Sequence, residues 1–315
     1  MIVRFAWTPT ILFAALAVPG CGEKPAATPV AVDPAKRREK VDREIAAILE
    51  SIAATETSAS ASSPEVDRLV ALGHDAVPGL LEALRKYDAA DQSSRAATAA
   101  YALAELVVDA DAPELDKLLK EGHGPAASAL RLLRLEIVAP ILASAVDRDL
   151  MTVDVEMAIL QVKGRPPVLV KAVNAWLERN LDTDDQYSLT GVSGILGRIG
   201  DEESARLVRK VFGVVLPDLE SKWQVPVALV QLGDRDAVEP LVIIFRAQKD
   251  LRETIGLELH KAFGAAIPVE VWPMLRNGID RSADMLDVDA FLAWWRDVRE
   301  KAVFDRSKRT WSIAK

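Results

Sequence analysis

The chain has 315 residues, half of them hydrophobic and only 5% aromatic, and 47 acidic side chains outnumber 39 basic ones for a net charge of −8. This apolar content is enough for a sizeable buried core and argues against global disorder, while the acidic balance disfavours binding to the phosphate backbone of nucleic acids. One cysteine and three histidines exclude a disulfide framework and a cysteine-rich zinc site.

Residues 1–20 have the order of features that an export signal requires. Arg4 supplies a short positively charged start, and residues 5–18 form a largely apolar run. That run is well short of the roughly 20 residues that span a bilayer, so it predicts a signal peptide rather than a transmembrane helix. Twin arginines are absent, which favours the general export route.

The end of this segment, "VPGC", is similar to the lipobox of bacterial lipoproteins, in which the signal is cut before a lipid-bearing cysteine. Val18 and Gly20 fit that pattern, whereas Pro19 departs from its usual small residue. The resemblance implies that Cys21 carries acyl chains such as palmitate. It places the exported protein at a bacterial membrane, on the outer membrane or the periplasmic face if the cell is Gram-negative. An ordinary secretory signal with a chance cysteine, or a short anchor, is the alternative.

A tether and a first helix follow the cysteine. Residues 21–34 are rich in Ala, Pro and Thr without a helical or strand period, which predicts a flexible linker. In residues 35–63, apolar side chains recur at helical spacing before a polar stretch, which predicts a leading helix and a second linker. Asp33 and Pro34 suit the start of that helix.

Residues 64–303 repeat one pattern at intervals of about 27 to 36 residues. Shifting "ILGRIGDEESARLV" by 33 residues onto "ALVQLGDRDAVEPL" aligns Gly200 with Gly233, each followed by aspartate, and "LGHDAVPGLLEAL" fits the same template around Gly73. Within each unit the apolar residues recur at helical spacing, and strand signals are nearly absent. The pattern predicts antiparallel helix pairs that stack on one another.

These units resemble HEAT repeats of the PBS-lyase HEAT-like kind: glycine and aspartate in the turn, an apolar helix with an early proline, and an alanine-rich partner helix. The resemblance implies an all-α fold, an α-solenoid of about seven helix pairs. It also implies a non-catalytic scaffold or adaptor that presents one face of the stack to an envelope protein. The alternative is a bilin-lyase-like enzyme or a small-ligand carrier, which requires a deep pocket with convergent polar groups.

The adjacent His74 and Asp75 are the first candidates for catalysis. In the two clearest other copies of the repeat, the place of His74 is taken by Asp201 and Asp234. A catalytic pair would not be exchanged so freely, whereas a solvent-facing turn accepts any polar residue. We therefore predict a turn whose aspartates cap the following helix, and we assign no catalytic residue.

Two further segments have only a superficial likeness to binding loops. The glycines at 191, 194, 197 and 200 lack the spacing of a nucleotide-binding loop, and no Lys–Ser or Lys–Thr pair follows them. They predict close helix packing instead. "DTDDQYSLTGVS" (182–193) lacks the glycine and glutamate of a calcium loop and predicts a turn that caps the next helix. Neither a metal nor a cofactor is expected.

Aromatic residues gather near the C-terminus. Phe291, Trp294 and Trp295 share one helical face, which predicts a cap over the last repeat, with an exposed partner-binding stripe as the alternative. The basic tail, residues 304–315, is expected to fray, with contact to anionic lipid headgroups as its alternative.

Candidate partner contacts follow from the HEAT resemblance as well. In HEAT-like stacks the second helix of each pair usually lines the concave side. By that resemblance, the polar and aromatic residues to test first are Tyr187, Trp223, Gln224, Arg252 and Glu253. Trp223 is equally compatible with a place in the core.

Overall fold

The computed structural model describes residues 33–52, 60–90, 92–215, 222–273 and 285–314. It is 74% helical with 15 α-helices, and in the described residues one two-stranded sheet accompanies them. The predicted all-α fold class is confirmed. Among the described helices, none combines the length and the apolar character that crossing a membrane requires. The predicted signal peptide and most of the tether lie outside the described residues.

The helices form two layers, because most helices contact a sequence neighbour in the other layer and also the helix two places along the chain in their own layer. The inner layer holds α2 (Pro64–Val70), α4 (Ser93–Leu106), α6 (Ala126–Ala129), α8 (Val153–Gln161), α10 (Gln186–Ile199), α12 (Gln224–Gln231) and α14 (Arg252–Phe263). The outer layer holds α1 (Pro34–Glu50), α3 (Val77–Ala89), α5 (Ala112–Lys120), α7 (Leu135–Asp147), α9 (Pro167–Arg179), α11 (Glu202–Val215), α13 (Val238–Ala247) and α15 (Val288–Val298).

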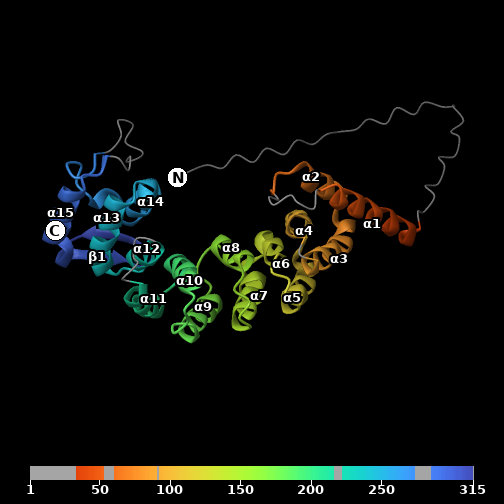
Figure 1. The fold of residues 1–315 in the computed structure, drawn as a ribbon, viewed down its shortest axis with the longest axis horizontal. Coiled ribbons are helices and arrows are strands. Elements are labelled where there is room, and N and C mark those ends of the chain that lie inside the picture. The colour runs from red at the N-terminus through yellow and green to blue at the C-terminus, as the bar shows by residue number, and fades with distance from the viewer. Residues whose placement is uncertain (1–32, 53–59, 91, 216–221, 274–284, 315) are drawn as a thin grey trace, which may run out of the picture.

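The two layers make a bowed row of helices (Figure 1). The even-numbered helices from α4 to α12 lie on the hollow side of the bow, and the odd-numbered helices from α3 to α11 lie on its outer side. The leading helix α1 contacts both α2 and α3, so it belongs to this packing rather than standing apart from it.

Local sequence signals set where several helices begin. Asp33 caps α1 by accepting a hydrogen bond from the backbone N–H of Ala35, and Pro34 is its first residue, as predicted. Asp185 caps α10 in the same way by accepting from the backbone N–H of Ser188, which confirms the turn predicted in place of a calcium loop.

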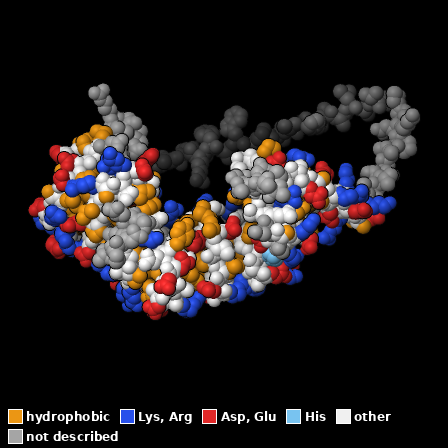
Figure 2. Space-filling view, in the orientation of Figure 1, with side chains coloured by type: hydrophobic (Ala, Val, Ile, Leu, Met, Phe, Trp, Pro, Cys, Tyr) orange, Lys and Arg blue, Asp and Glu red, His pale blue; other side chains and the backbone are white. Residues whose placement is uncertain are grey.

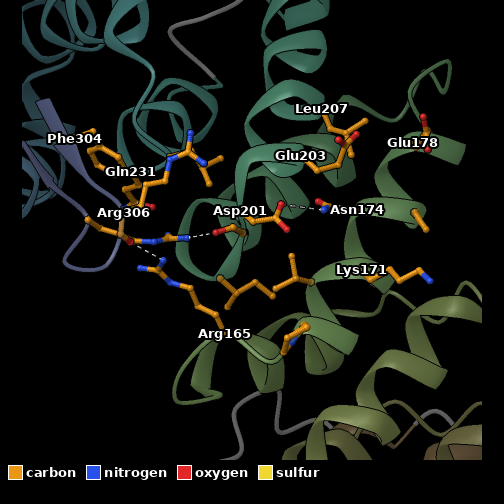
Figure 3. A pocket seen from close by; sticks show the side chains of 17 residues that line it. Arg165, Lys171, Asn174, Glu178, Asp201, Glu203, Leu207, Gln231, Phe304 and Arg306 are labelled. Atoms are coloured by element: carbon orange, nitrogen blue, oxygen red, sulfur yellow. Dashed lines mark hydrogen bonds between the residues drawn. The ribbon is translucent and has the colours of Figure 1, made fainter.

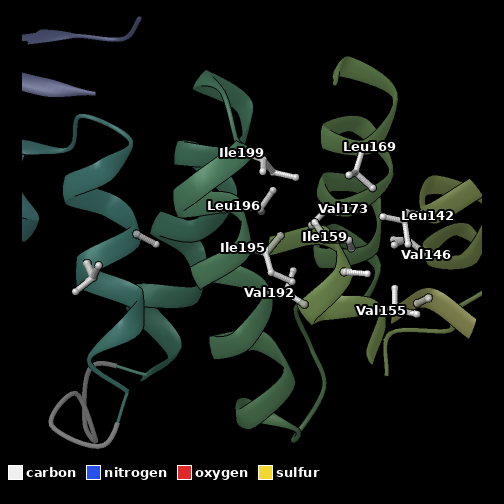
Figure 4. Close-up of a cluster of buried hydrophobic side chains, with 14 of the residues drawn as sticks. Leu142, Val146, Val155, Ile159, Leu169, Val173, Val192, Ile195, Leu196 and Ile199 are labelled. Carbon is white, nitrogen blue, oxygen red and sulfur yellow. The ribbon is translucent and has the colours of Figure 1, made fainter. Parts of the chain in front are cut away.

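One continuous hydrophobic cluster runs between the two layers along the described residues. Its central part lies between α7, α8, α9 and α10, where Ile159 lies between Leu142 on the α7 side and Ile195 on the α10 side (Figure 4). At the N-terminal end, Leu80 is fully buried, whereas the next residue, Leu81, is only partly buried. The face of α3 that packs into the core is therefore narrower than the face that its two adjacent leucines would predict.

The glycines of α10 were predicted to allow close helix packing, and this is confirmed at Gly197. A Cβ placed there would lie 2.8 Å from the backbone Cα of Ala228 in α12, closer than real Cβ atoms come. Gly194 differs, because a Cβ at that position would meet nothing nearer than Gln224 Cβ at 4.0 Å. Gly197 is thus the residue that lets α10 and α12 approach.

The C-terminal tail does not fray, so that prediction is wrong. β1 (Ala302–Asp305) pairs antiparallel with β2 (Thr310–Ile313) in a hairpin. Trp311 is only 4% exposed, and its ring stacks on Phe263 with centroids 5.9 Å apart. Its indole Nε1 also donates to the carbonyl of Val230 at 3.2 Å.

The predicted aromatic cap is present beneath this hairpin. Phe291 and Trp295 of α15 are fully buried, and both rings contact Phe263 of α14 edge to face. The end of the helical row is therefore closed by α15 together with the hairpin.

Candidate functional site

His74 and Asp75 lie in a short 3₁₀ turn, His74–Ala76, and do not pair with each other. The Nε2 atom of His74 is 3.0 Å from Asp111 Oδ2 in the next helix pair, and Asp75 forms an ion pair with Arg37. Both side chains are largely exposed. The predicted turn is confirmed, and these contacts hold neighbouring helices together instead of preparing a base.

The turn aspartates behave differently from one repeat to the next. The carboxylates of Asp201 and Asp234 accept from backbone N–H groups at the start of the following segment, at 3.1 and 3.0 Å, as predicted. Asp75 makes no such cap, so the prediction is wrong at that position. Across the described residues, no group of three or more His, Cys, Asp or Glu side chains is placed to hold a metal ion.

The five predicted partner contacts all lie at the N-terminal ends of inner-layer helices. Tyr187 is the second residue of α10 and is 78% exposed, and Glu253 at the start of α14 is also exposed. Trp223 and Gln224, at the start of α12, are partly buried. Arg252 is partly buried too, and its guanidinium donates to the backbone carbonyls at the end of α13. Their role in binding a partner stays a prediction.

Three exposed apolar side chains form what we call the inner-layer patch: Val153, Met157 and Tyr187. Val153 is 69% exposed and Met157 49% exposed, and they lie one turn apart on α8, beside α10. Figure 2 shows hydrophobic side chains gathered in the hollow of the bow around α8. Sequence reasoning identified Tyr187 but missed the two residues of α8, whose apolar spacing is the same as that of a core-facing stripe.

Two glycines of α10 lie between this patch and α12. Gly191 and Gly194 have no side chain to cover the backbone, and beyond Gly194 the space is open up to Gln224. The carboxylate of Glu156 borders Gly191. Burial, and to a lesser extent the negative charge of Asp185, raises the pKa of Glu156. The hollow of the bow thus combines exposed apolar side chains with two partly exposed glycines.

A cavity of about 710 Å³ lies between the hairpin and the helices, and we call it the hairpin cavity (Figure 3). α9, the turn between α10 and α11, and the end of α12 contribute its walls, and the hairpin closes one side. Sequence reasoning missed this cavity, because the segment that closes it was expected to fray.

Three arginines line the hairpin side of the cavity. Arg165 donates to the backbone carbonyl of Arg306 at 2.8 Å, and Arg306 pairs with Glu202 at 2.9 Å. Arg309 donates from Nη2 to the carbonyl of Gly200 at 2.6 Å, while its Nη1 is buried and has no hydrogen-bond partner among the residues that the structure describes. Burial, and then the charge of Arg165, lowers the pKa of Arg309 to about 10, so the side chain stays positively charged at neutral pH.

The acidic residues of the cavity are engaged elsewhere or lie at its far end. Asp201 accepts from Asn174 and from Ser204, and Glu203 forms an ion pair with Arg206. Glu178 lies on α9 at the end away from the arginines (Figure 3).

Comparison with family models, with curated proteins and with solved structures finds no match to this chain. The HEAT resemblance and the lipobox resemblance therefore stay predictions. The inner-layer patch and the hairpin cavity have to be interpreted from their own geometry.

Proposed function

We propose that this protein is a non-catalytic scaffold of HEAT-like repeats, lipid-tethered at a bacterial envelope, that binds another protein along its inner helical layer. The observation that carries the proposal is the inner-layer patch, where Val153, Met157 and Tyr187 are exposed on neighbouring helices of the hollow face. Exposed apolar groups that gather in this way on a concave surface are typical of protein-binding sites. The uncovered backbone at Gly194 adds room for a partner segment to approach closely.

A photo-crosslinking amino acid at position 187 tests the scaffold, with the full chain made in its native organism. We expect irradiation to give a discrete adduct with one partner protein, and Met157→Lys to abolish it because a charge then replaces an apolar contact. The matched control is the same crosslinker at Val168, an exposed apolar position on outer-layer helix α9. Equal adducts at positions 187 and 168, or an adduct indifferent to Met157→Lys, would contradict the proposal.

The lipid tether has its own test. Wild type is expected in the membrane fraction and in the detergent phase, whereas Cys21→Ser is expected in the aqueous phase, because two or more acyl chains give stable attachment and none remain in the variant. The mass of the N-terminal peptide identifies the modification. Pro19→Ala, which restores the usual small residue before Gly20, serves as the control and should be processed at least as completely. A water-soluble wild type with an unmodified Cys21 would refute the tether.

The alternative function, a bilin-lyase-like enzyme or a small-ligand carrier, has one observation in its favour. The hairpin cavity has the volume of a small-molecule site and contains convergent polar groups from separate repeats. This favours a bound ligand, but it does not by itself indicate a reaction.

A further inference from the structure

We propose that the hairpin cavity binds an amphiphilic organic anion, a small molecule with a carboxylate or phosphate head group and an apolar body. The head group would lie at the arginines, and the body would extend over the apolar floor toward α11. This proposal does not depend on the scaffold function, since none of the residues of the inner-layer patch lines the cavity.

The first argument is unneutralised charge. Within the part of the chain that the structure describes, Arg165 and Arg309 form no ion pair with a carboxylate, and each donates only to a backbone carbonyl. Arg306 differs, because Glu202 already neutralises it. Two neighbouring guanidinium groups at one end of a cavity provide the planar donor geometry that carboxylate and phosphate oxygens prefer.

The second argument is the buried Nη1 atom of Arg309. It has no acceptor among the described residues, although a buried charged donor without a partner is costly. The guanidinium is fixed in place by its bond to the carbonyl of Gly200, so it cannot turn to water without breaking that bond. An anionic oxygen at this position would satisfy the donor and would also reduce the repulsion between Arg309 and Arg165.

The third argument is the shape and lining of the cavity. Its volume of about 710 Å³ falls within the range of sites for drug-sized molecules. The remaining wall is largely apolar and includes Val170, Ile199, Leu207, Leu232 and Phe304. The three arginines are concentrated at the hairpin end, whereas Lys171 and Glu178 of α9 line the far end (Figure 3), so the cavity matches a ligand whose anionic group lies at the hairpin and whose body is mainly apolar.

Isothermal titration calorimetry on the full chain carrying Cys21→Ser tests this proposal without detergent, whether or not the wild type is acylated. The probes are octanoate, octyl phosphate and octan-1-ol, which share one apolar chain and differ in the head group. We expect at least one anion to bind about tenfold or more tightly than the alcohol, because a charge-assisted hydrogen bond to arginine adds to the same apolar contact. The tighter of the two anions identifies the head group.

Arginine variants then locate the site. Arg165→Gln and Arg309→Gln should each weaken binding of that anion about tenfold and leave binding of octan-1-ol unchanged. Arg246→Gln, which removes a surface arginine paired with Asp289, is the control and should change nothing. Arg165 is exposed, so its variant decides the outcome if Arg309→Gln fails to fold. Equal affinity for the alcohol and both anions, or anion binding indifferent to Arg165→Gln, would overturn the proposal.

Discussion

Trp311→Ala is expected to lower the free energy of unfolding by about 3–5 kcal/mol, the range measured for truncating a buried large aromatic side chain. Trp311 is almost completely buried, it stacks on Phe263, and it meets Trp295 edge to face with centroids 5.8 Å apart. The substitution also removes the hydrogen bond to Val230. Urea denaturation followed by circular dichroism measures the change.

Val303→Ala is the matched control for this prediction, because it truncates an exposed side chain in the same hairpin. It should change the unfolding free energy by no more than about 0.5 kcal/mol. A small effect of both substitutions would mean that the hairpin does not pack against the helices, and the hairpin cavity would lose its closing wall.

Gly197→Ala is expected to destabilise the protein by about 1–3 kcal/mol, the cost of adding a methyl group to a well-packed interface. The new Cβ would lie 2.8 Å from the backbone of Ala228 and 2.6 Å from Gln231 Oε1. A backbone atom cannot move aside as a side chain can, so α10 and α12 would have to separate. Thermal unfolding, monitored by circular dichroism, reports the loss.

Gly194→Ala, one turn earlier in the same helix, is the control. Its Cβ would make only an ordinary van der Waals contact, 4.0 Å from Gln224 Cβ, so the gain in helix propensity of up to about 1 kcal/mol should appear as neutral or increased stability. If both alanines proved equally destabilising, close packing at Gly197 would not be the reason for that glycine.

The regular part of the fold was predictable because its signals are local. Asp33, Ser63 and Asp185 cap the helices that they precede, and each cap needs only residues two or three places along the chain. The repeated sequence pattern of residues 64–303 predicted stacked helix pairs, and this prediction did not require knowing which side chains are in contact.

The hairpin and its cavity were not predictable for the opposite reason. Each strand has only four residues, too few for an alternating pattern to stand out. Trp311 is held by Val230, which lies 81 positions away in the chain. Arg165 and Arg309 come together only through the packing of several helix pairs, so no contiguous sequence motif predicts the cavity.

The hairpin also changes how the row of helices can bend. In a stack of repeats each unit ordinarily contacts only its neighbours, so small changes in the angle between successive units add up along the row. The backbone of Arg306 is tied to Arg165 at the start of α9, 141 positions earlier, and Arg309 is tied to Gly200, 109 positions earlier. These two hydrogen bonds connect the hairpin to helices far earlier in the chain, so we expect the portion from α9 onward to bend less than a row of helices with neighbour contacts alone. On this basis we expect bending to occur mainly between α1 and α8, where it would change the width of the hollow and leave the shape of the hairpin cavity unchanged.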